Sequence, residues 1–301
     1  MKKLLVSAFL SVCLATPHMA WALTHARDTV PLHPGTDLIL FYYFNCTANK
    51  LYNDGNKVGP SDDYNKSVNM GAFRYGHYFS AGNSLYGDGP FVIMPQIIVP
   101  FADINLSGNY EAHNNGKEFS TTGFGDPWLL STFWPVNDPK HRFWVAFSPW
   151  LSIPLGQYDR NRPVSVGHNR WIFKPETAIT KGFGEKTLLE LVLYYEMYGD
   201  NDKFLGNYKK EQDGLFGTDV HLSYDLTKQL VVSLDYYFTN GGETRINGAS
   251  QRDKQENHGL GISLFYMIGT NNQLMLSYRD DFSVKSGAGD NTLAVRWAYV
   301  F

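Results

Sequence analysis

A histidine and a serine stand two residues apart, as His221 and Ser223, in a segment where polar and apolar residues alternate. Residues two apart on a β-strand project from the same face, and a histidine beside a serine can activate the hydroxyl for hydrolysis. Hydrolysis of lipid would need the pair to face lipid and a third group to orient the histidine. No asparagine or acid is clearly placed for that role, and the alternation turns the pair toward the polar face. We therefore predict no catalytic residue and no enzyme, with a lipid hydrolase as the third alternative.

Charged residues recur on the same polar face of consecutive predicted strands. An isolated buried charge is very costly, so these groups must pair with one another or stay hydrated inside a narrow lumen. Two interpretations stay open: a polar lining that selects solutes, and an ion-pair network that fills and stiffens the interior. The predicted lumen-lining residues are Arg142, Lys174, Glu176, Glu190, Glu196, Asp219, His221, Ser223, Asp225, Asp235, Arg279, Asp281 and Arg296.

Two further groups of polar residues lie in predicted loops. Asp54-Gly55, Asp62-Asp63, Asp88 and Asp200-Asn201-Asp202 offer oxygen ligands of the kind that calcium uses. Such clusters are typical of tight turns and lack EF-hand spacing, so we predict no metal site and no cofactor. The stretch from Asp159 to Arg162, with His168-Asn169-Arg170 beyond it, makes one long loop partly cationic. This loop would suit lipopolysaccharide phosphates or a gate, although an ordinary solvated loop is the simpler interpretation.

The elements that must position these residues are β-strands, because hydrophobicity repeats every two residues in most readable segments. In the last segment, Leu293, Val295, Trp297, Tyr299 and Phe301 alternate with Thr292, Ala294, Arg296, Ala298 and Val300. Pro95 and Pro149 interrupt two runs, and we expect bulges or weaker pairing there, since proline lacks the ladder donor. The pattern predicts twelve strands, near residues 37–45, 67–79, 90–101, 124–134, 141–154, 170–180, 186–198, 214–225, 229–239, 257–267, 272–282 and 291–301.

The connections between these strands alternate in length, at about 21, 10, 22, 6, 15, 5, 15, 3, 18, 4 and 8 residues. Outer-membrane barrels have short periplasmic turns and long extracellular loops, and lipid cannot satisfy an open sheet edge. We therefore predict an all-β fold, a transmembrane antiparallel up-and-down β-barrel of about 12 strands. A soluble exported β-sandwich or lipocalin-like barrel is the alternative, but it has no reason to alternate its loops.

The N-terminal residues predict export. Met1-Lys2-Lys3 and the apolar run from Leu4 to Ala15 have the form of a secretory signal peptide. The small-x-small rule places cleavage after Ala22, with Ala20 as the second choice. The expected organisation is a signal peptide at 1–22, an N-terminal periplasmic segment at 23–36 and a bacterial outer-membrane β-barrel at 37–301. Cys46 would be the only cysteine left, which excludes an intramolecular disulfide.

Aromatic residues form 15% of the chain, yet the mean hydropathy is −0.29. This combination suits strands with one face toward lipid and the other toward water. The net charge of −3 and the lack of a basic cluster with interleaved aromatics give no indication of nucleic-acid binding. Trp150 is interpreted as an interfacial residue, Trp144 is left open, and Phe301 is the expected C-terminal assembly signal. The predicted aromatic girdle comprises Tyr42, Trp128, Trp134, Trp171, Tyr236, Trp297 and Tyr299.

Several motifs resemble the outer-membrane protein family associated with the meta-cleavage pathway of phenol degradation. They cover nearly the whole mature chain and are specific to the family, but they are not catalytic motifs. The resemblance implies an outer-membrane channel for hydrophobic or aromatic compounds. The motifs are Pro34-Gly35-Thr36 with Phe41-Tyr42-Tyr43, Leu51-Tyr52-Asn53-Asp54-Gly55, Gly123-Phe124-Gly125-Asp126-Pro127, Ile153 to Asp159, Asn161-Arg162-Pro163, Gly167 to Trp171, Tyr198 to Asp202 and Glu211-Gln212-Asp213.

The favoured function is passive movement of small hydrophobic or aromatic molecules across the outer membrane, in connection with phenol degradation. The alternative is a plugged barrel that acts as an anchor, adhesin or receptor, which a lumen filled by an inserted segment such as 46–66 or 102–123 would favour. The expected partners are membrane lipid, lipopolysaccharide, the barrel-assembly machinery and a small hydrophobic solute. The sequence contains no motif that identifies the solute.

Overall fold

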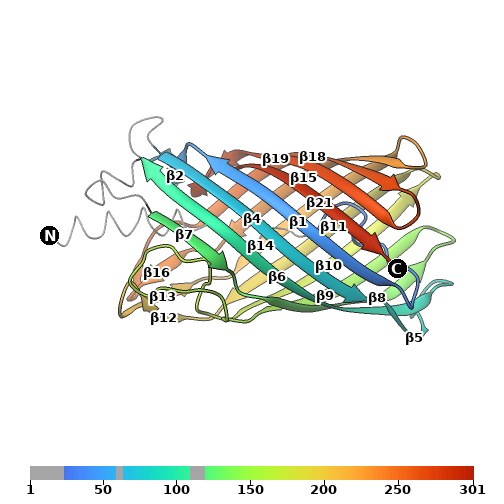
Figure 1. Ribbon diagram of the computed structural model, residues 1–301, viewed down its shortest axis with the longest axis horizontal. Helices are drawn as coiled ribbons and strands as arrows, with labels where there is room; N and C mark the ends of the chain where they lie inside the picture. The colour runs from blue at the N-terminus through green and yellow to red at the C-terminus, as the bar shows by residue number, and fades with distance from the viewer. Residues whose placement is uncertain (1–23, 59–63, 109–118) are drawn as a thin grey trace.

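The computed structural model shows a closed β-barrel and describes residues 24–58, 64–108 and 119–301 (Figure 1). The predicted signal peptide and its cleavage after Ala22 lie outside the described residues. Each strand of the wall pairs with the next, and the prediction of an antiparallel barrel of twelve strands is confirmed. The wall strands are β1 (Asp37–Ala48), β4 (Tyr64–His77), β6 (Pro90–Gly108), β8 (Trp128–Asp138), β9 (Phe143–Ser152), β10 (Ile172–Phe183), β11 (Thr187–Tyr198), β14 (Leu215–Asp225), β15 (Leu230–Gly241), β18 (Gln255–Ile268), β19 (Asn272–Val284) and β21 (Asn291–Val300).

The first and last strands close the barrel. β1 pairs with β21 from Leu38 opposite Val300 to Thr47 opposite Asn291, and the backbones of Asp37 and Phe301 exchange two further hydrogen bonds. Closure leaves no edge whose N–H and C=O groups would face lipid. Among the described residues, no helix is long and apolar enough to span a bilayer.

The two ends of the barrel differ. At one end, which we call the long-loop end, β2 (Leu51–Asn53) and β3 (Asn56–Lys57) form a small sheet with β20 (Gly287–Ala288). A second small sheet there contains β12 (Asn201–Phe204), β13 (Tyr208–Gln212), β16 (Thr244–Ile246) and β17 (Ala249–Ser250), and β7 (Phe119–Phe124) pairs with the outer part of β6. The opposite, short-turn end carries the C-terminus and β5 (Phe79–Asn83) (Figure 1).

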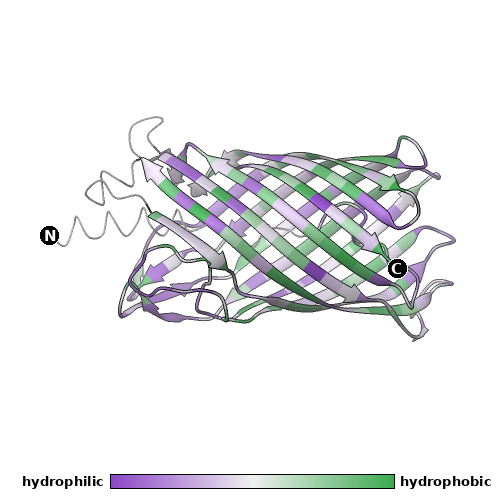
Figure 2. Cartoon of the chain, viewed as in Figure 1, coloured by the Kyte–Doolittle hydropathy of each residue, from purple (hydrophilic) through white to green (hydrophobic). Residues whose placement is uncertain are grey.

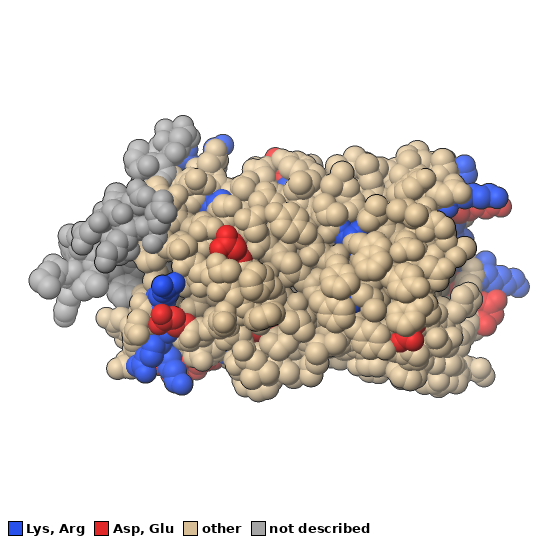
Figure 3. Space-filling view, in the orientation of Figure 1, with Lys and Arg blue, Asp and Glu red and all other residues tan. Residues whose placement is uncertain are grey.

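Hydrophobicity alternates along each strand as the period of two predicts (Figure 2). On β11, Leu189, Leu193 and Met197 are exposed on the outer surface, whereas Glu190 and Glu196 are fully buried inside. The barrel flank seen in Figure 3 shows few charged side chains, and they gather mainly at its two ends. This distribution fits a wall surrounded by lipid, because charges on the lipid face destabilise a barrel.

The prolines have unequal effects on pairing. β6 runs through Pro95 in continuous register with β8, so the bulge or weaker pairing expected there is absent between these two described strands. On β9, Pro149 lies opposite Pro175 of β10. The ladder between β8 and β9 shows no pair at Ser131 or Thr132, where Pro149 and Ser148 would be the partners.

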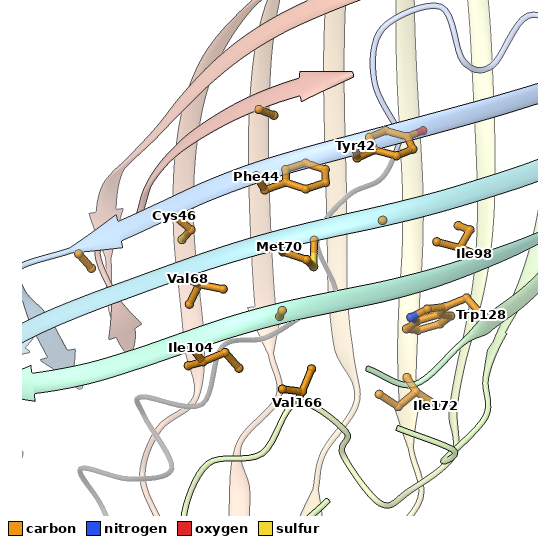
Figure 4. Packing of buried hydrophobic residues seen from close by; sticks show 14 of the residues in the cluster. Tyr42, Phe44, Cys46, Val68, Met70, Ile98, Ile104, Trp128, Val166 and Ile172 are labelled. Carbon is orange, nitrogen blue, oxygen red and sulfur yellow. The ribbon is translucent and has the colours of Figure 1, made fainter. Parts of the chain in front are cut away.

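Apolar side chains fill much of the interior along β1, β4 and β6. Phe44, Met70, Ile104 and Val166 belong to one buried cluster (Figure 4). All but Val166 lie on wall strands, and Val166 comes from the connection between β9 and β10. A barrel of this size is narrow enough for side chains to fill, so free space in the lumen depends on what else enters it.

Candidate functional site in the barrel lumen

Residues 24–30, which we call the plug segment, lie inside the barrel. The Thr24 hydroxyl donates to Glu176 of β10 over 3.3 Å, and the Trp134 indole N–H of β8 donates to the Thr29 carbonyl over 2.7 Å. The Thr29 hydroxyl also contacts Thr180 of β10 at 2.6 Å. The expectation that 23–36 is a periplasmic segment is therefore wrong for the plug segment, which returns into the lumen from the start of β1.

Arg27 attaches the plug segment to one side of the lumen. Its backbone N–H donates to both carboxylate oxygens of Glu190 at 2.9 and 2.8 Å. Its guanidinium donates to the Ser223 hydroxyl over 3.0 Å and pairs with Asp225 at 2.8 Å. Arg27 has a φ of 72°, a left-handed conformation that non-glycine residues rarely adopt. This conformation is maintained by contacts from both its backbone and its side chain.

Asp28 attaches the same segment to the opposite side. Its carboxylate accepts from Nη1 of Arg296 on β21 at 2.8 and 2.9 Å, and the Arg296 Nη2 donates to Gln273 over 2.8 Å. Around the ring, β14 lies five strand pairings from β1 in one direction and seven in the other, and β21 lies next to β1. Arg27 and Asp28, which are adjacent and oppositely charged, thus connect β11 and β14 on one side of the lumen with β21 on the other.

We call the side formed by β11, β14 and β15 the acidic side. Its centre is Asp235, which pairs with His221 Nδ1 at 2.7 Å and accepts from the Ser233 and Ser263 hydroxyls at 2.6 Å each. The expectation that no acid orients His221 is wrong, since Asp235 does so from the neighbouring strand. His221 and Asp235 are directly opposite in the register of β14 and β15, so the hairpin pairing was the signal that could have revealed them.

The opposite, basic side carries Arg296 on β21 and Arg74 on β4. Arg74 donates through Nε to Gln96 over 2.7 Å and through Nη1 to the Tyr42 hydroxyl over 3.4 Å. Neither Arg74 nor Gln96 is among the lumen residues predicted from the sequence. Gln96 is the single polar residue on the inner face of β6, and Arg74 shares the inner face of β4 with only one other charged residue, Lys66, so both give a weak signal.

Most of the remaining predicted lumen residues contact neighbours on the same strand or on an adjacent strand. Lys174 pairs with Glu176 at 3.1 Å and lies 3.9 Å from the ring centre of Trp150. Glu196 accepts from Tyr198 at 2.5 Å, Asp219 is buried, and Arg279 pairs with Asp281 at 2.8 Å.

Arg142 is a correction to the predicted lining. It lies in the turn between β8 and β9, with a positive φ of 52°, and its guanidinium contacts the Gly184 carbonyl of the neighbouring turn. The predicted strand begins before Arg142, whereas β9 begins at Phe143. In the turn that precedes β9, the alternation of a strand no longer determines where a side chain points.

The aromatic residues divide between the two faces. Tyr42, Trp128 and Trp134 are at most 9% exposed and lie inside the barrel, so their assignment to the girdle was wrong. Trp150, also interpreted as interfacial, lies inside as well, and so does Trp144. Aromatic rings pack as readily against lumen neighbours as against lipid headgroups, so residue type alone did not decide the face. The residues that do lie on the outer face or its rim are Trp171, Tyr236, Trp297, Tyr299 and Phe301.

Residues 153–171, which we call the inner loop, enter the lumen from the long-loop end. Val164 and Val166 are buried among the lumen-facing apolar residues, and Figure 4 shows Val166 near the side chains of the wall strands. Two of its three arginines, by contrast, are engaged at the rim: Arg160 donates to the Gly206 carbonyl over 2.6 Å and Arg162 to the Ser120 carbonyl over 3.0 Å. The third, Arg170, is buried and lies over the ring of Tyr198 at 4.6 Å. The inner loop therefore connects the wall to neighbouring loops.

Glycine-rich motifs that are far apart in sequence fold together at the base of the inner loop. A Cβ on Gly156 would lie 2.6 Å from the Gly125 carbonyl carbon, and one on Gly167 would lie 2.7 Å from that of Gly156. These backbone contacts exclude any side chain, and they give a physical reason for glycine at positions in two of the motifs.

Asp126 holds the same region by charge. Its carboxylate accepts from the Gly156 and His168 backbone N–H groups at 2.8 and 2.7 Å, and it lies 3.2 Å from His168 Nδ1. Burial raises the pKa of Asp126, but the hydrogen bonds and the charge of His168 outweigh this effect and lower the pKa overall. The ionised carboxylate therefore stabilises the inner loop.

A cavity of about 170 Å³ lies between the plug segment and the basic side. Arg74, Arg296 and Asp28 line it together with Tyr78 and Trp134. No group of three or more His, Cys, Asp or Glu side chains in the described ranges is arranged to hold a metal ion. The aromatic rings and charged groups of its lining make the cavity a candidate site for a small solute.

Residues 48–297 match the model of a family described as "Putative MetA-pathway of phenol degradation". The chain belongs to this family. It is 26% identical to the COG4313 outer membrane channel from Pseudomonas putida F1, with coverage of 92% of this chain and 100% of that chain and a TM-score of 0.84. The transport unit of the autotransporter AIDA-I from Escherichia coli is similar in fold alone, with 11% identity, coverage of 98% and 96% and a TM-score of 0.53. No curated protein matches the chain.

These relationships establish the class of the protein. It has the fold of an outer-membrane channel, and the resemblance to a solved channel places it in the outer membrane. Its fold resembles that of a solved outer-membrane channel, and the description of its family links it to phenol degradation.

Proposed function

We propose that the protein is a passive outer-membrane channel for small hydrophobic or aromatic compounds. The observation that carries this proposal is the lumen lining, where aromatic rings alternate in space with paired charges. Such rings offer flat apolar contact to a flat solute, and the phenol-degradation description of the family supports the same class of solute. The lumen aromatics include Tyr42, Trp128, Trp134, Trp144, Trp150, Tyr194 and Tyr237.

The plug segment acts as the gate in this proposal. It forms no strand with the wall, and its contacts are hydrogen bonds and ion pairs through Thr24, Arg27, Asp28 and Thr29. A segment held in this way can leave without breaking the barrel ladder. Passage of a solute then requires only a shift of residues 24–30, and neither the barrel strands nor an energy source is involved.

The experiment compares the full mature chain with a variant that lacks residues 24–30. Single-channel current in planar bilayers measures opening, and uptake of a radiolabelled aromatic solute by cells with or without the chain measures transport. We expect brief openings for the full chain, long openings for the variant, and faster uptake in both. No current and no uptake from folded protein, even without the plug segment, would overturn the proposal.

That negative outcome would favour the second function, a plugged barrel that serves as an anchor, adhesin or receptor. The plug segment and the inner loop both occupy the lumen, and this observation supports such a role. Under it, removal of residues 24–30 would leave the lumen closed by the inner loop, and current would stay absent.

The proposed contacts outside the lumen follow from the surface. Lipid would surround the apolar flank, lipopolysaccharide would meet the cationic rim of the inner loop, and the barrel-assembly machinery would read Phe301. Phe301 is 52% exposed, which supports its accessibility to a partner. Replacing Phe301 with Ser should lower the amount of assembled barrel, as measured by heat-modifiable migration on gels. Unchanged assembly would remove this role.

A further inference from the structure

The cavity beside the plug segment carries an excess of positive charge. Arg27, Arg74 and Arg296 line it, and Asp28 is the carboxylate that lines it with them. Arg27 pairs with Asp225 on the acidic side, while the contacts of Arg74 with Gln96 and Tyr42 are to neutral groups. Within this lining, the negative charge that pairs with Arg296 therefore comes from Asp28 of the plug segment.

The contact between Asp28 and Arg296 leaves part of the guanidinium unused. Both oxygens of Asp28 accept from the one nitrogen Nη1, Nη2 donates to Gln273, and Nε has no partner within the described chain. Arg296 is only 4% exposed, so this donor is also shielded from bulk water. A buried donor without a partner costs free energy, and arginine binds a carboxylate best through two parallel N–H donors. A freely diffusing carboxylate can reach a better geometry than Asp28 does.

The size and the other lining residues favour an aromatic solute. A cavity of about 150 Å³ with apolar walls is known to take up benzene, and this one measures about 170 Å³. The rings of Tyr78 and Trp134 are stacked at 5.8 Å on its wall, and both residues are nearly fully buried. A flat ring can lie against them while its charged group meets an arginine.

We propose that this cavity binds a small aromatic monocarboxylate, whose carboxylate replaces that of Asp28 on Arg296. Binding then detaches the plug segment from the basic side, so that the solute itself opens the lumen through which it passes. The role in opening rests on the proposed channel function, whereas the binding site itself does not. In the absence of solute, the carboxylate of Asp28 fills the position that the carboxylate of the solute would take on Arg296.

Isothermal titration calorimetry of the folded mature chain in detergent tests the site, with sodium benzoate as the probe and benzyl alcohol as its neutral counterpart. We expect benzoate to bind the wild-type chain more tightly than benzyl alcohol. In Asp28→Asn the internal carboxylate is gone, so the Kd for benzoate should fall about tenfold (about 1.4 kcal/mol), while benzyl alcohol should change less than twofold. Asp159→Asn, in an exposed part of the inner loop, is the matched control and should change neither.

A second variant separates the site from general loosening of the plug segment. Arg296→Gln in the Asp28→Asn background should abolish the preference for benzoate, and heat-modifiable migration checks that the barrel is folded. Equal affinity for the two probes in Asp28→Asn, weaker benzoate binding in that variant, or a preference that survives Arg296→Gln would each overturn the proposal. Because binding is measured without a membrane, benzoate binding without transport would refute only the channel, and transport without benzoate preference would refute only this site.

Discussion

The plug segment and the inner loop both occupy the lumen, but they are held there by different interactions. Arg27 and Asp28 tie the plug segment to opposite sides through charge-assisted hydrogen bonds. The inner loop is held mainly by burial of Val164 and Val166 and by direct backbone contact at Gly156, and Asp126 adds hydrogen bonds at its base. A segment held by charge can be released by a competing ion. A segment held by close packing is released only when a packed group is removed or when a larger group is forced into the same space. The plug segment is therefore the better gate, and the inner loop the better part of the wall.

Overfilling the base of the inner loop should have the largest effect. In Gly156→Ala the new methyl would meet backbone atoms of Gly125 and Asp126 at 2.6 and 2.7 Å, which cannot move as a side chain can. We expect a cost of about 2 to 3 kcal/mol, the upper part of the range for overpacking. Trypsin cleavage after Arg160 should become roughly 30-fold faster.

The control for this variant is Gly71→Ala on β4, where an added Cβ would have only ordinary contact with the Tyr42 carbonyl at 3.8 Å. Its cleavage rate should stay near that of wild type. If Gly156→Ala is equally resistant, the inner loop is not held by close packing and the contrast with the plug segment disappears.

Neutralising the anchor of the plug segment comes next. Glu190 is fully buried and accepts from the Arg27 backbone and the Thr29 hydroxyl. Glu190→Gln retains the shape but weakens bonds to a charged acceptor, each worth about 1.5 to 3 kcal/mol. The open fraction in single-channel recordings should rise roughly tenfold or more, with trypsin cleavage of the inner loop unchanged.

Glu185→Gln, in the exposed turn before β11, is the matched control and should leave the open fraction unaltered. An open fraction that stays low in Glu190→Gln would mean that charge does not hold the plug segment.

Acid should loosen the inner loop by a smaller amount. Because the pKa of Asp126 is lowered in the folded protein, its stabilisation is complete above the ordinary aspartate pKa of about 3.9. It is lost as the pH falls through the lowered value. Hydrogen exchange of residues 153–171, corrected for intrinsic rates, should lose protection by about 1 kcal/mol in that acidic range. In Asp126→Asn the protection should be lower at neutral pH and nearly independent of pH, whereas a wild-type-like acid profile in this variant would assign the effect to another group.

Salt should produce the smallest change. The pair between Arg27 and Asp225 is only partly buried, with side-chain exposures of 26% and 27%, and salt screens such pairs. Between about 0.1 and 1 M KCl we expect the open fraction to rise by a factor of about two, beyond the change in bulk conductivity. Trypsin resistance of the inner loop should not change, and a parallel loss of resistance would contradict the distinction between the two segments.

The wall of the barrel could be predicted closely from sequence. The run from Leu293 to Phe301 and the run from Phe216 to Asp225 both keep the phase in which the structure has them. Lipid on one face and a polar interior on the other impose a period of two, and the ladder imposes similar lengths on neighbouring strands. Where a strand passes into a turn this constraint ends, and Arg142 was misplaced for that reason.

The contents of the lumen were predicted only in part. The charges on β11, β14 and β15 were expected there, but Trp128 and Trp134 were expected at the membrane interface. An aromatic ring satisfies either environment, so its type does not report its face. The residues of the plug segment show no periodicity at all, and nothing local indicates that they return into the barrel.

By itself, the sequence of this protein determined the strand number, the topology and the resemblance to an outer-membrane family, because these follow from local periodicity, loop length and motifs. Only the tertiary structure decided what occupies the lumen. The partners of Arg27 and Asp28 on the barrel wall and its turns lie from 159 to 268 residues away in the chain. Contacts at such separations depend on how the whole ring closes, and this is why the gate and its solute site could be recognised only in the folded barrel.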